Sequence, residues 1–256
     1  MNQSAAMGND VPEKLDVVIT MGGLGSRFLK AGYKLPKYMI PAKGKTLFEW
    51  SMISLEGFRE RVEQYIFIAL KNDELDVRKF VEKECEHLKI RNYQIILLDR
   101  LTDGQATTAV MAKQYWHRDN GLLIYNIDTY VEAGEMKYSD LKGDGFIPCF
   151  RAEGDHWSFV RTDENGEVVE IKEKQRISDQ CTLGAYYFRS CEFYQQLYEE
   201  YYGVPRELVN GEKYVAPLYD YLLSKGGKIY ISEVPARAVN VLGTPEELSA
   251  FLHQEE

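Results

Sequence analysis

The chain has 256 residues, 45% of them hydrophobic, and its 40 acidic and 31 basic side chains give a formal net charge of -9. This length allows one large core, and the acidic balance argues against non-specific nucleic-acid binding, which requires a basic surface. No apolar run approaches the ~20 residues of a membrane helix, and the four cysteines form no C-x-x-C pair, which favours reduced thiols in a cytoplasmic protein over a zinc site.

The first part of the chain alternates strand-like and helical patterns. Residues 1–14 are polar and lack the features of a signal peptide, so we expect a disordered leader there and a single folded domain at residues 15–256. We expect strands at residues 16–20, 65–70, 93–98 and 122–126. Helices are expected at residues 47–58, 73–87 and 106–116, the first preceded by a Thr46 and Glu49 capping-box pattern. This alternation predicts right-handed crossovers and a mainly parallel sheet.

The pattern changes after about Gly143. Short strands are expected at residues 146–151, 157–162, 168–172 and 183–189, with a hairpin turn at 163–166. Two helices, at 191–202 and 214–224, precede a strand at 228–234 and a final helix that Thr244 and Pro245 would start. We therefore divide the domain into two halves, 15–143 and 144–256, that share one sheet.

A glycine-rich turn leaves the first predicted strand and is followed by positive charge. It reads MGGLGSRF and contains Gly22, Gly23 and Gly25. Such glycines let the backbone approach a ligand and aim its N–H groups at it, and ligands of parallel sheets sit beyond the carboxyl ends of strands. We expect phosphates to bind there, with Arg27, Lys34 and Lys37 neutralising their charge. The alternative is an ordinary turn with solvated charges.

The turn matches neither a Walker loop nor the dinucleotide fingerprint. Together with KLPKYMIPAKGKTLFEW, it resembles the signature of the sugar-1-phosphate nucleotidyltransferases: a glycine loop ending in G-[ST]-R, then P-K, then a G-K-P-[ML] turn, here Gly44-Lys45-Thr46-Leu47. The resemblance covers residues 15–252. It implies an α/β, Rossmann-like fold (GT-A-like), with a mixed, mainly parallel sheet flanked by helices, in which residues 15–143 form the nucleotide-binding half and 144–256 the acceptor half.

The reaction that this resemblance implies is attack by a phosphate oxygen of a sugar phosphate on the α-phosphorus of a nucleoside triphosphate, with release of pyrophosphate. The residues that it places at the nucleotide are Met21, Gly22, Gly23, Gly25, Ser26 and Arg27. Arg27 would hold the β- and γ-phosphates, and Lys37 would stabilise charge at the reacting phosphorus. Both are predicted catalytic residues, together with Asp128.

The nucleobase is read in this family by a Gly/Gln-rich turn that opens a helix. The matching turn here contains Gly104, Gln105 and Thr108. Gln105 offers a donor and an acceptor to a base edge, and Gly104 would allow close approach. In isolation, Asp103 as a helix cap and an exposed Gln105 would explain the same pattern.

Asp128 follows the strand at 122–126, where a carboxylate suits magnesium that bridges phosphate oxygens. It could also cap a turn, but the family places a metal-binding aspartate in this context. A second ligand is expected from the late D-x-G-T-P-E-D-L element. This chain has Val241 at the aspartate position, so Asn240 is the predicted second ligand and Mg²⁺ the predicted cofactor.

The acceptor site is predicted from the second half of the chain. In relatives, an E-K pair contacts the sugar phosphate, and the corresponding residues are Glu173 and Lys174. A solvated, salt-bridged hairpin is the alternative for this pair. Gly184 would lie beside the substrate, and Trp157 would wall the pocket or join the core.

We therefore expect a cytoplasmic, metal-dependent nucleotidyltransferase whose partners are a nucleoside triphosphate and a sugar 1-phosphate or similar acceptor, without nucleic acid or membrane. Capsule or surface-glycan precursor synthesis is the expected role. The alternatives are a cytidylyltransferase for a non-sugar phosphate such as phosphocholine, a non-catalytic nucleotide-sugar-binding protein, and a GT-A glycosyltransferase, which would carry Asp-x-Asp where this chain has Asn126-Ile127-Asp128. The nucleobase and any homo-oligomer are left open.

Overall fold

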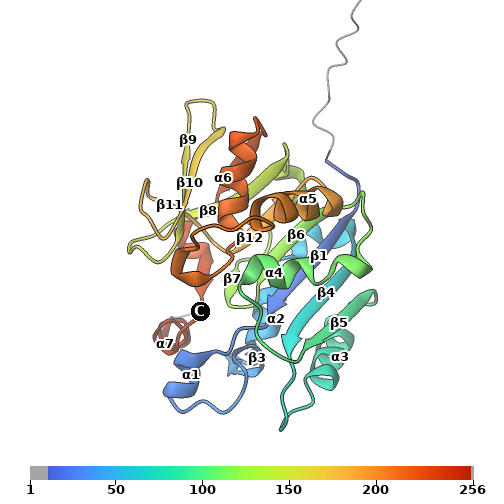
Figure 1. The fold of residues 1–256 in the computed structure, drawn as a ribbon. Coiled ribbons are helices and arrows are strands. Elements are labelled where there is room, and N and C mark those ends of the chain that lie inside the picture. The colour runs from blue at the N-terminus through green and yellow to red at the C-terminus, as the bar shows by residue number, and fades with distance from the viewer. Residues whose placement is uncertain (1–10, 255–256) are drawn as a thin grey trace, which may run out of the picture.

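A ten-stranded mixed sheet forms the centre of the computed structural model, which describes residues 11–254 (Figure 1). Its first half consists of four parallel strands in the order β6-β1-β4-β5. These strands are β1 (Leu15–Met21), β4 (Val62–Leu70), β5 (Tyr93–Leu98) and β6 (Gly121–Asn126). Each predicted strand of this half lies within one of them, so the mainly parallel core is confirmed.

The second half of the sheet continues from β6 in the order β12-β8-β11-β9-β10, with antiparallel pairing, and β13 adds to β8 in parallel. The strands are β8 (Gly145–Arg151), β9 (Ser158–Thr162), β10 (Val168–Glu173), β11 (Gln180–Thr182), β12 (Ala185–Phe188) and β13 (Ile229–Glu233). The predicted hairpin at 163–166 is confirmed, because it joins the antiparallel β9 and β10. The strand predicted at 183–189 starts later, because Gly184 has a φ of 88° and separates β12 from β11, which the prediction missed.

Six of the seven helices in the described part of the chain occur where they are expected, although several are shorter, and the short helix at 26–30 was not predicted. The helices are α1 (Ser26–Lys30), α2 (Leu47–Ile53), α3 (Val77–His87), α4 (Gln105–Val110), α5 (Cys191–Tyr202), α6 (Ala216–Ser224) and α7 (Pro245–His253). The predicted helix 47–58 stops early and continues as a 3₁₀ segment, in which Gly57 packs against the Met136 carbonyl. Among residues 11–254, none of these helices has the length and apolar character to cross a membrane.

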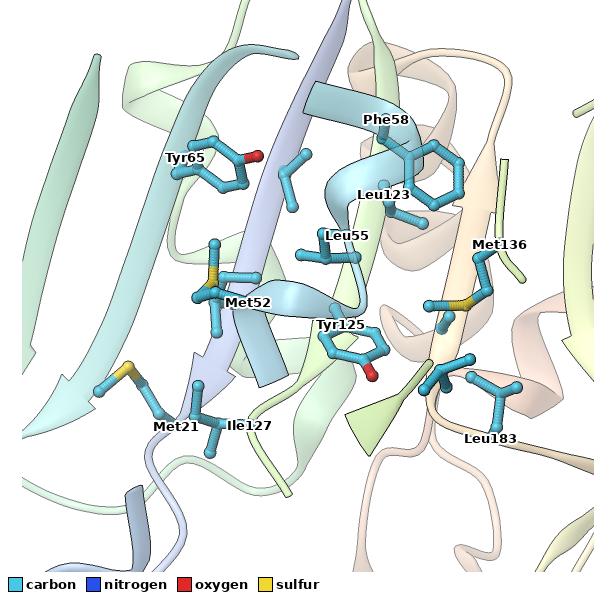
Figure 2. Close-up of a cluster of buried hydrophobic side chains, with 14 of the residues drawn as sticks. Met21, Met52, Leu55, Phe58, Tyr65, Leu123, Tyr125, Ile127, Met136 and Leu183 are labelled. Carbon is cyan, nitrogen blue, oxygen red and sulfur yellow. The ribbon is translucent and has the colours of Figure 1, made fainter. Parts of the chain in front are cut away.

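Helices cover both faces of the sheet (Figure 1). Because side chains alternate along a strand, Val17 and Ile19 of β1 belong to one buried cluster and Val18 to another. The first cluster includes residues of α2 and α3, and Figure 2 shows part of it around Met52, Leu123 and Tyr125. The second includes residues of α4, α5 and α6. The result is a three-layer α/β/α domain.

A smaller cluster joins the two ends of the chain. Phe28 of α1 packs with Leu248 and Phe251 of α7, and the two helices lie side by side in Figure 1. Nearby are two short two-stranded sheets, β2 (Pro41–Ala42) with β3 (Lys45–Thr46) and β7 (Thr129–Val131) with β14 (Val239–Val241). This packing places the start of α7 beside the turn that follows β6.

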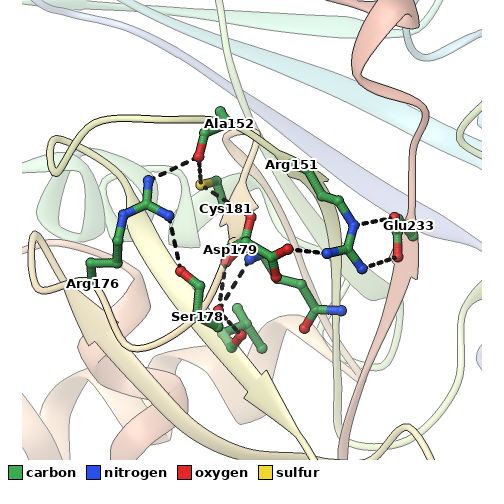
Figure 3. A network of polar contacts seen from close by, with 9 residues as sticks. Arg151, Ala152, Arg176, Ser178, Asp179, Cys181 and Glu233 are labelled. Atoms are coloured by element: carbon green, nitrogen blue, oxygen red, sulfur yellow. Dashed lines mark hydrogen bonds and ion pairs between the residues drawn. The ribbon is translucent and has the colours of Figure 1, made fainter.

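Ion pairs and hydrogen bonds hold the antiparallel part of the sheet together (Figure 3). Arg151 of β8 donates to Glu233 of β13 at 2.8 Å and also pairs with Asp179, just before β11. Arg176 donates to the carbonyls of Ala152 and Ser178 at 2.8 and 3.1 Å. These contacts fix the loop that follows Lys174, and so support the part of the sheet that carries the predicted acceptor residues.

Most of the predicted leader, residues 1–10, lies outside the described residues. Of the rest, Val11 packs against the core, and the Pro12 carbonyl accepts a hydrogen bond from the Tyr138 hydroxyl at 2.8 Å.

Candidate active site

A cavity of about 700 Å³ opens at the carboxyl ends of β1 and β6. Thr20 near the end of β1 and Asn126 at the end of β6 both line it. The chain runs outward from β1 through β4 to β5 and then returns to β6 on the other side of β1. The cavity therefore lies at the point where the strand order reverses, which is where open α/β sheets bind ligands.

The glycine loop forms one wall of this cavity. Gly22 and Gly23 line it, and a side chain added to Gly23 would meet nothing within 4 Å. Neither residue has a positive φ, so the protein's own packing and backbone geometry do not demand glycine at Gly23. Open space beside exposed backbone is what a closely bound phosphate needs. Arg27 of α1 also lines the cavity, while Phe28 is buried and anchors that short helix.

Two of the residues that line the cavity form an ion pair. The Lys37 ammonium donates to Asp128 Oδ2 at 2.6 Å, and the two side chains are 16% and 25% exposed. Lys37 begins a 3₁₀ turn after Pro36, and Asp128 lies in the turn between β6 and β7. Both face the cavity. The cavity thus contains one positive and one negative group in direct contact.

The predicted base-reading turn also borders the cavity, with Gly104, Gln105 and Thr108 among its lining residues. The Gln105 amide donates to Thr20 Oγ1 at 3.2 Å and to Asn126 Oδ1, so it is oriented by two strand ends. Thr108 is buried and donates to the Gly104 carbonyl at 3.1 Å. These contacts hold the start of α4 at the mouth of the cavity.

The reason for glycine at position 104 differs from the one expected. Its φ is 141°, and a Cβ there would lie 2.4 Å from the Lys213 carbonyl oxygen and 2.5 Å from the Lys213 nitrogen. The close approach at Gly104 is therefore made by the chain's own backbone. Gly184 is similar: its φ is 88°, and a Cβ would lie 2.4 Å from the Asn126 amide nitrogen.

Charged and aromatic groups surround the other end of the cavity. Glu173 ends β10 and Lys174 follows it. Both line the cavity, as do Trp157, Tyr186 and Tyr214. Burial raises the pKa of Glu173 above its ordinary value of 4.5, although Ser158 donates a hydrogen bond to it. The Lys174 ammonium contacts the Tyr214 hydroxyl and lies 4.3 Å from the centre of that ring.

Trp157 lines the cavity and also packs against the hydrophobic core. Its ring lies 5.2 Å from that of Phe150 and 4.2 Å from that of His156, and its indole N–H donates to the Glu153 carbonyl at 2.9 Å. The two readings of Trp157 left open by the sequence therefore both describe its position.

Five predicted site residues do not line the cavity. They are Met21, Gly25, Ser26, Lys34 and Asn240. Met21 is buried in the core shown in Figure 2, and Gly25 starts α1 in the left-handed conformation. Asn240 is 8% exposed, whereas its neighbour Val241 lines the cavity. Because neighbouring side chains on a strand point to opposite sides, Asn240 points to the side of β14 opposite to Val241.

Sequence reasoning missed several lining residues, among them Tyr214, Glu212 and Glu247. Glu247 lies in the first turn of α7, and a Cβ on Gly243 would be 3.5 Å from its Oε2 and 3.1 Å from Asp128 Oδ2. The available signal was the T-P-E-E sequence, which looks like an ordinary helix start. Among residues 11–254, no three His, Cys, Asp or Glu side chains form a group suited to a metal ion.

The fold and the cavity define an α/β domain with a candidate site at the carboxyl ends of its parallel strands, and comparison with solved structures identifies its family. A nucleoside-diphosphate-sugar pyrophosphorylase from Vibrio cholerae RC9 is 35% identical, with a TM-score of 0.85, over 93% of this chain and 100% of that one. The chain therefore belongs to the sugar-1-phosphate nucleotidyltransferase family, which is nucleotide-sugar pyrophosphorylase-like, and is a nucleotidyltransferase.

More distant structures share the fold alone. The inositol-1-phosphate CTP transferase of T. maritima is 13% identical with a TM-score of 0.72, over 97% of this chain and 100% of that one. The CTP:phosphocholine cytidylyltransferase of Streptococcus pneumoniae is also 13% identical, with a TM-score of 0.70, over 93% and 98% of the two chains. No protein-family model matches the sequence, and no curated protein matches it either.

Proposed function

We propose that this protein transfers a nucleotidyl group from a nucleoside triphosphate to a sugar 1-phosphate or similarly phosphorylated acceptor and releases pyrophosphate. The observation that carries the proposal is the Lys37–Asp128 pair at 2.6 Å, inside a cavity whose wall is an open glycine loop. A polyphosphate has the charge to bind Lys37 and the shape to fit a cavity whose wall is an open glycine loop. The roles of the residues below belong to this proposal.

Backbone N–H groups and cationic side chains would bind the nucleotide. The N–H groups of Gly22 and Gly23, with Arg27, would bind the β- and γ-phosphates, and Lys37 would stabilise the charge that develops at the α-phosphorus. Gln105 would hydrogen-bond the base edge, since it is already oriented by Thr20 and Asn126. An acceptor phosphate is anionic near neutral pH, so its attack requires positioning and charge stabilisation and no general base.

Two carboxylates near Gly243 would serve a divalent cation whose remaining ligands are phosphate oxygens. Asp128 supplies a carboxylate, and a second carboxylate oxygen beside it, on Glu247, is buried and without a hydrogen-bond partner among the described residues. Such oxygens suit Mg²⁺. When bound, the cation would neutralise charge on the phosphate oxygens. Asp128 would orient it toward the triphosphate.

The acceptor end combines Lys174, which would bind the acceptor phosphate, with Glu173, which would accept hydrogen bonds from acceptor hydroxyls. One observation favours a second candidate acceptor, phosphocholine. Trp157, Tyr186 and Tyr214 line this end together with Glu173, and aromatic rings with an acid can hold a quaternary ammonium group. The capsule or surface-glycan role and the cytoplasmic location stay predictions of the sequence.

The test is pyrophosphate release from each of the four nucleoside triphosphates with a panel of sugar 1-phosphates, phosphocholine and inositol 1-phosphate. Pyrophosphate that appears only when triphosphate and acceptor are both present supports the proposal, and the acceptor that supports turnover separates the two candidates. Nucleotide-sugar binding without turnover would favour the non-catalytic alternative. Release of nucleoside diphosphate from a finished nucleotide sugar would favour a glycosyltransferase.

A further inference from the structure

Two helices of this protein begin with the same four-residue pattern, T-x-x-E, but use the glutamate differently. At α2, Thr46 Oγ1 accepts the Glu49 N–H at 3.1 Å, and the Glu49 carboxylate accepts the Thr46 N–H at 2.7 Å. At α7, Thr244 Oγ1 likewise accepts the Glu247 N–H at 3.1 Å. The Glu247 carboxylate, however, does not close the box. Helix capping therefore does not explain where this carboxylate points.

The Glu247 carboxylate faces the active-site cavity. Its Oε2 atom is buried and has no hydrogen-bond partner among the described residues, and Glu247 lines the cavity. A buried carboxylate oxygen without a partner is costly in free energy, because it has lost its hydrogen bonds to water and has formed none with the protein. We therefore expect the partner of the Glu247 carboxylate to be a bound ligand.

Asp128 and Glu247 both approach the same point beside Gly243. Asp128 Oδ2 is 3.1 Å, and Glu247 Oε2 is 3.5 Å, from the point where a Gly243 Cβ would stand. Glycine at this position keeps free the space that the two carboxylates border. Two negative oxygens that face one small space favour a cation there. Asp128 already pairs with Lys37, whereas Glu247 Oε2 has no hydrogen-bond partner among the described residues.

We propose that Glu247, together with Asp128, holds the divalent cation of this enzyme. In this chain, Glu247 takes the place of the aspartate that the family pattern has at Val241. Asn240 takes no part, because it does not line the cavity and lies on the side of β14 opposite to Val241. The inference rests on the proposed metal-dependent nucleotidyl transfer. A carboxylate ligand at this site also binds a hard cation more strongly than the amide of Asn240 would.

Lys37 contacts an oxygen atom that is proposed to bind the cation. Its ammonium contacts Asp128 Oδ2, the same oxygen that faces Gly243. A divalent cation at this place competes with Lys37 for that oxygen. Removing the ammonium should therefore strengthen cation binding in the absence of nucleotide.

The experiment is titration of the full chain with Mn²⁺ alone, without nucleotide, following the electron paramagnetic resonance signal of free Mn²⁺. We expect Glu247→Gln and Asp128→Asn each to raise the Mn²⁺ dissociation constant at least about tenfold. Glu246→Gln is the matched control, since Glu246 is exposed and precedes Glu247 in α7, and it should bind like the wild type. Lys37→Met should bind Mn²⁺ more tightly than the wild type.

Rescue separates ligation from a structural role of Glu247. The double variant Glu247→Gln, Val241→Asp should regain Mn²⁺ affinity, because Val241 lines the cavity and an aspartate there restores the second carboxylate. Unchanged Mn²⁺ affinity in Glu247→Gln, or a wild type that binds no Mn²⁺, overturns the inference. If pyrophosphate release persists in either case, the proposed function holds and only the cation site is wrong. If Glu247→Gln loses Mn²⁺ affinity but no substrate pair yields pyrophosphate, the cation site holds and the proposed function is wrong.

Discussion

Two glycines of the active site allow a direct test of what each is for. Gly104→Ala places a Cβ 2.4–2.5 Å from the backbone of Lys213 at a φ of 141°. Such a backbone conformation costs a residue with a side chain about 1–3 kcal/mol. At about 2–4 °C per kcal/mol for a domain of this size, the melting temperature should fall by roughly 2–12 °C before the clash itself is counted.

Gly23→Ala should have the opposite profile. The added methyl meets nothing within 4 Å and φ is not positive, so the protein loses no packing. Fewer conformations in the unfolded chain should then leave the melting temperature unchanged or raise it by up to roughly 4 °C. The same methyl occupies the space proposed for a phosphate, so KM for the triphosphate should rise about tenfold, or about 1.4 kcal/mol.

Differential scanning calorimetry and steady-state pyrophosphate release measure the two effects on the same preparations. Equal losses of melting temperature in both variants would show that Gly23 is a structural glycine. A wild-type KM in Gly23→Ala, with the fold intact, would show that phosphates bind elsewhere. Either result would refute the reasoning that open space beside the loop marks the phosphate site.

Three further predictions concern charge and capping. Lys37→Ala and Asp128→Ala should each lower kcat about 10²–10³-fold while the far-ultraviolet circular dichroism stays that of the wild type, and near-normal turnover in either would remove it from the catalytic residues. Because burial raises the pKa of Glu173, the folded state keeps a proton that the unfolded state loses above about pH 4.5, so stability falls as pH rises through the raised pKa. Glu173→Gln should therefore gain melting temperature relative to the wild type from about pH 4.5 upward and match it below; a pH-independent difference contradicts this. Thr46→Ala should cost about 1 kcal/mol in urea unfolding, since the capping box is formed, and no change would show that Glu49 is held otherwise.

The sequence by itself determined the sheet core and the nucleotide side of the site. Apolar runs alternating with helical patterns specify parallel strands, because both faces of such strands must be covered. This pattern correctly predicted β1, β4, β5 and β6. The position of the glycine loop after β1 then predicted that Arg27 and Lys37 lie at the carboxyl end of that strand, where both line the cavity. Local chemistry was equally readable at Thr46 and Glu49, since a capping box involves neighbours in the chain.

Only the tertiary structure decided the contacts between distant segments. Gly104 is glycine because Lys213 crosses it, and Gly184 because Asn126 does, and no local pattern records such approaches. Likewise, Thr-x-x-Glu at α2 and at α7 looks the same in the sequence, yet only the packing of α7 beside the β6–β7 turn brings Glu247 to Asp128. Propensity acts over neighbouring residues, whereas the surroundings of a carboxylate depend on chain segments more than a hundred residues away.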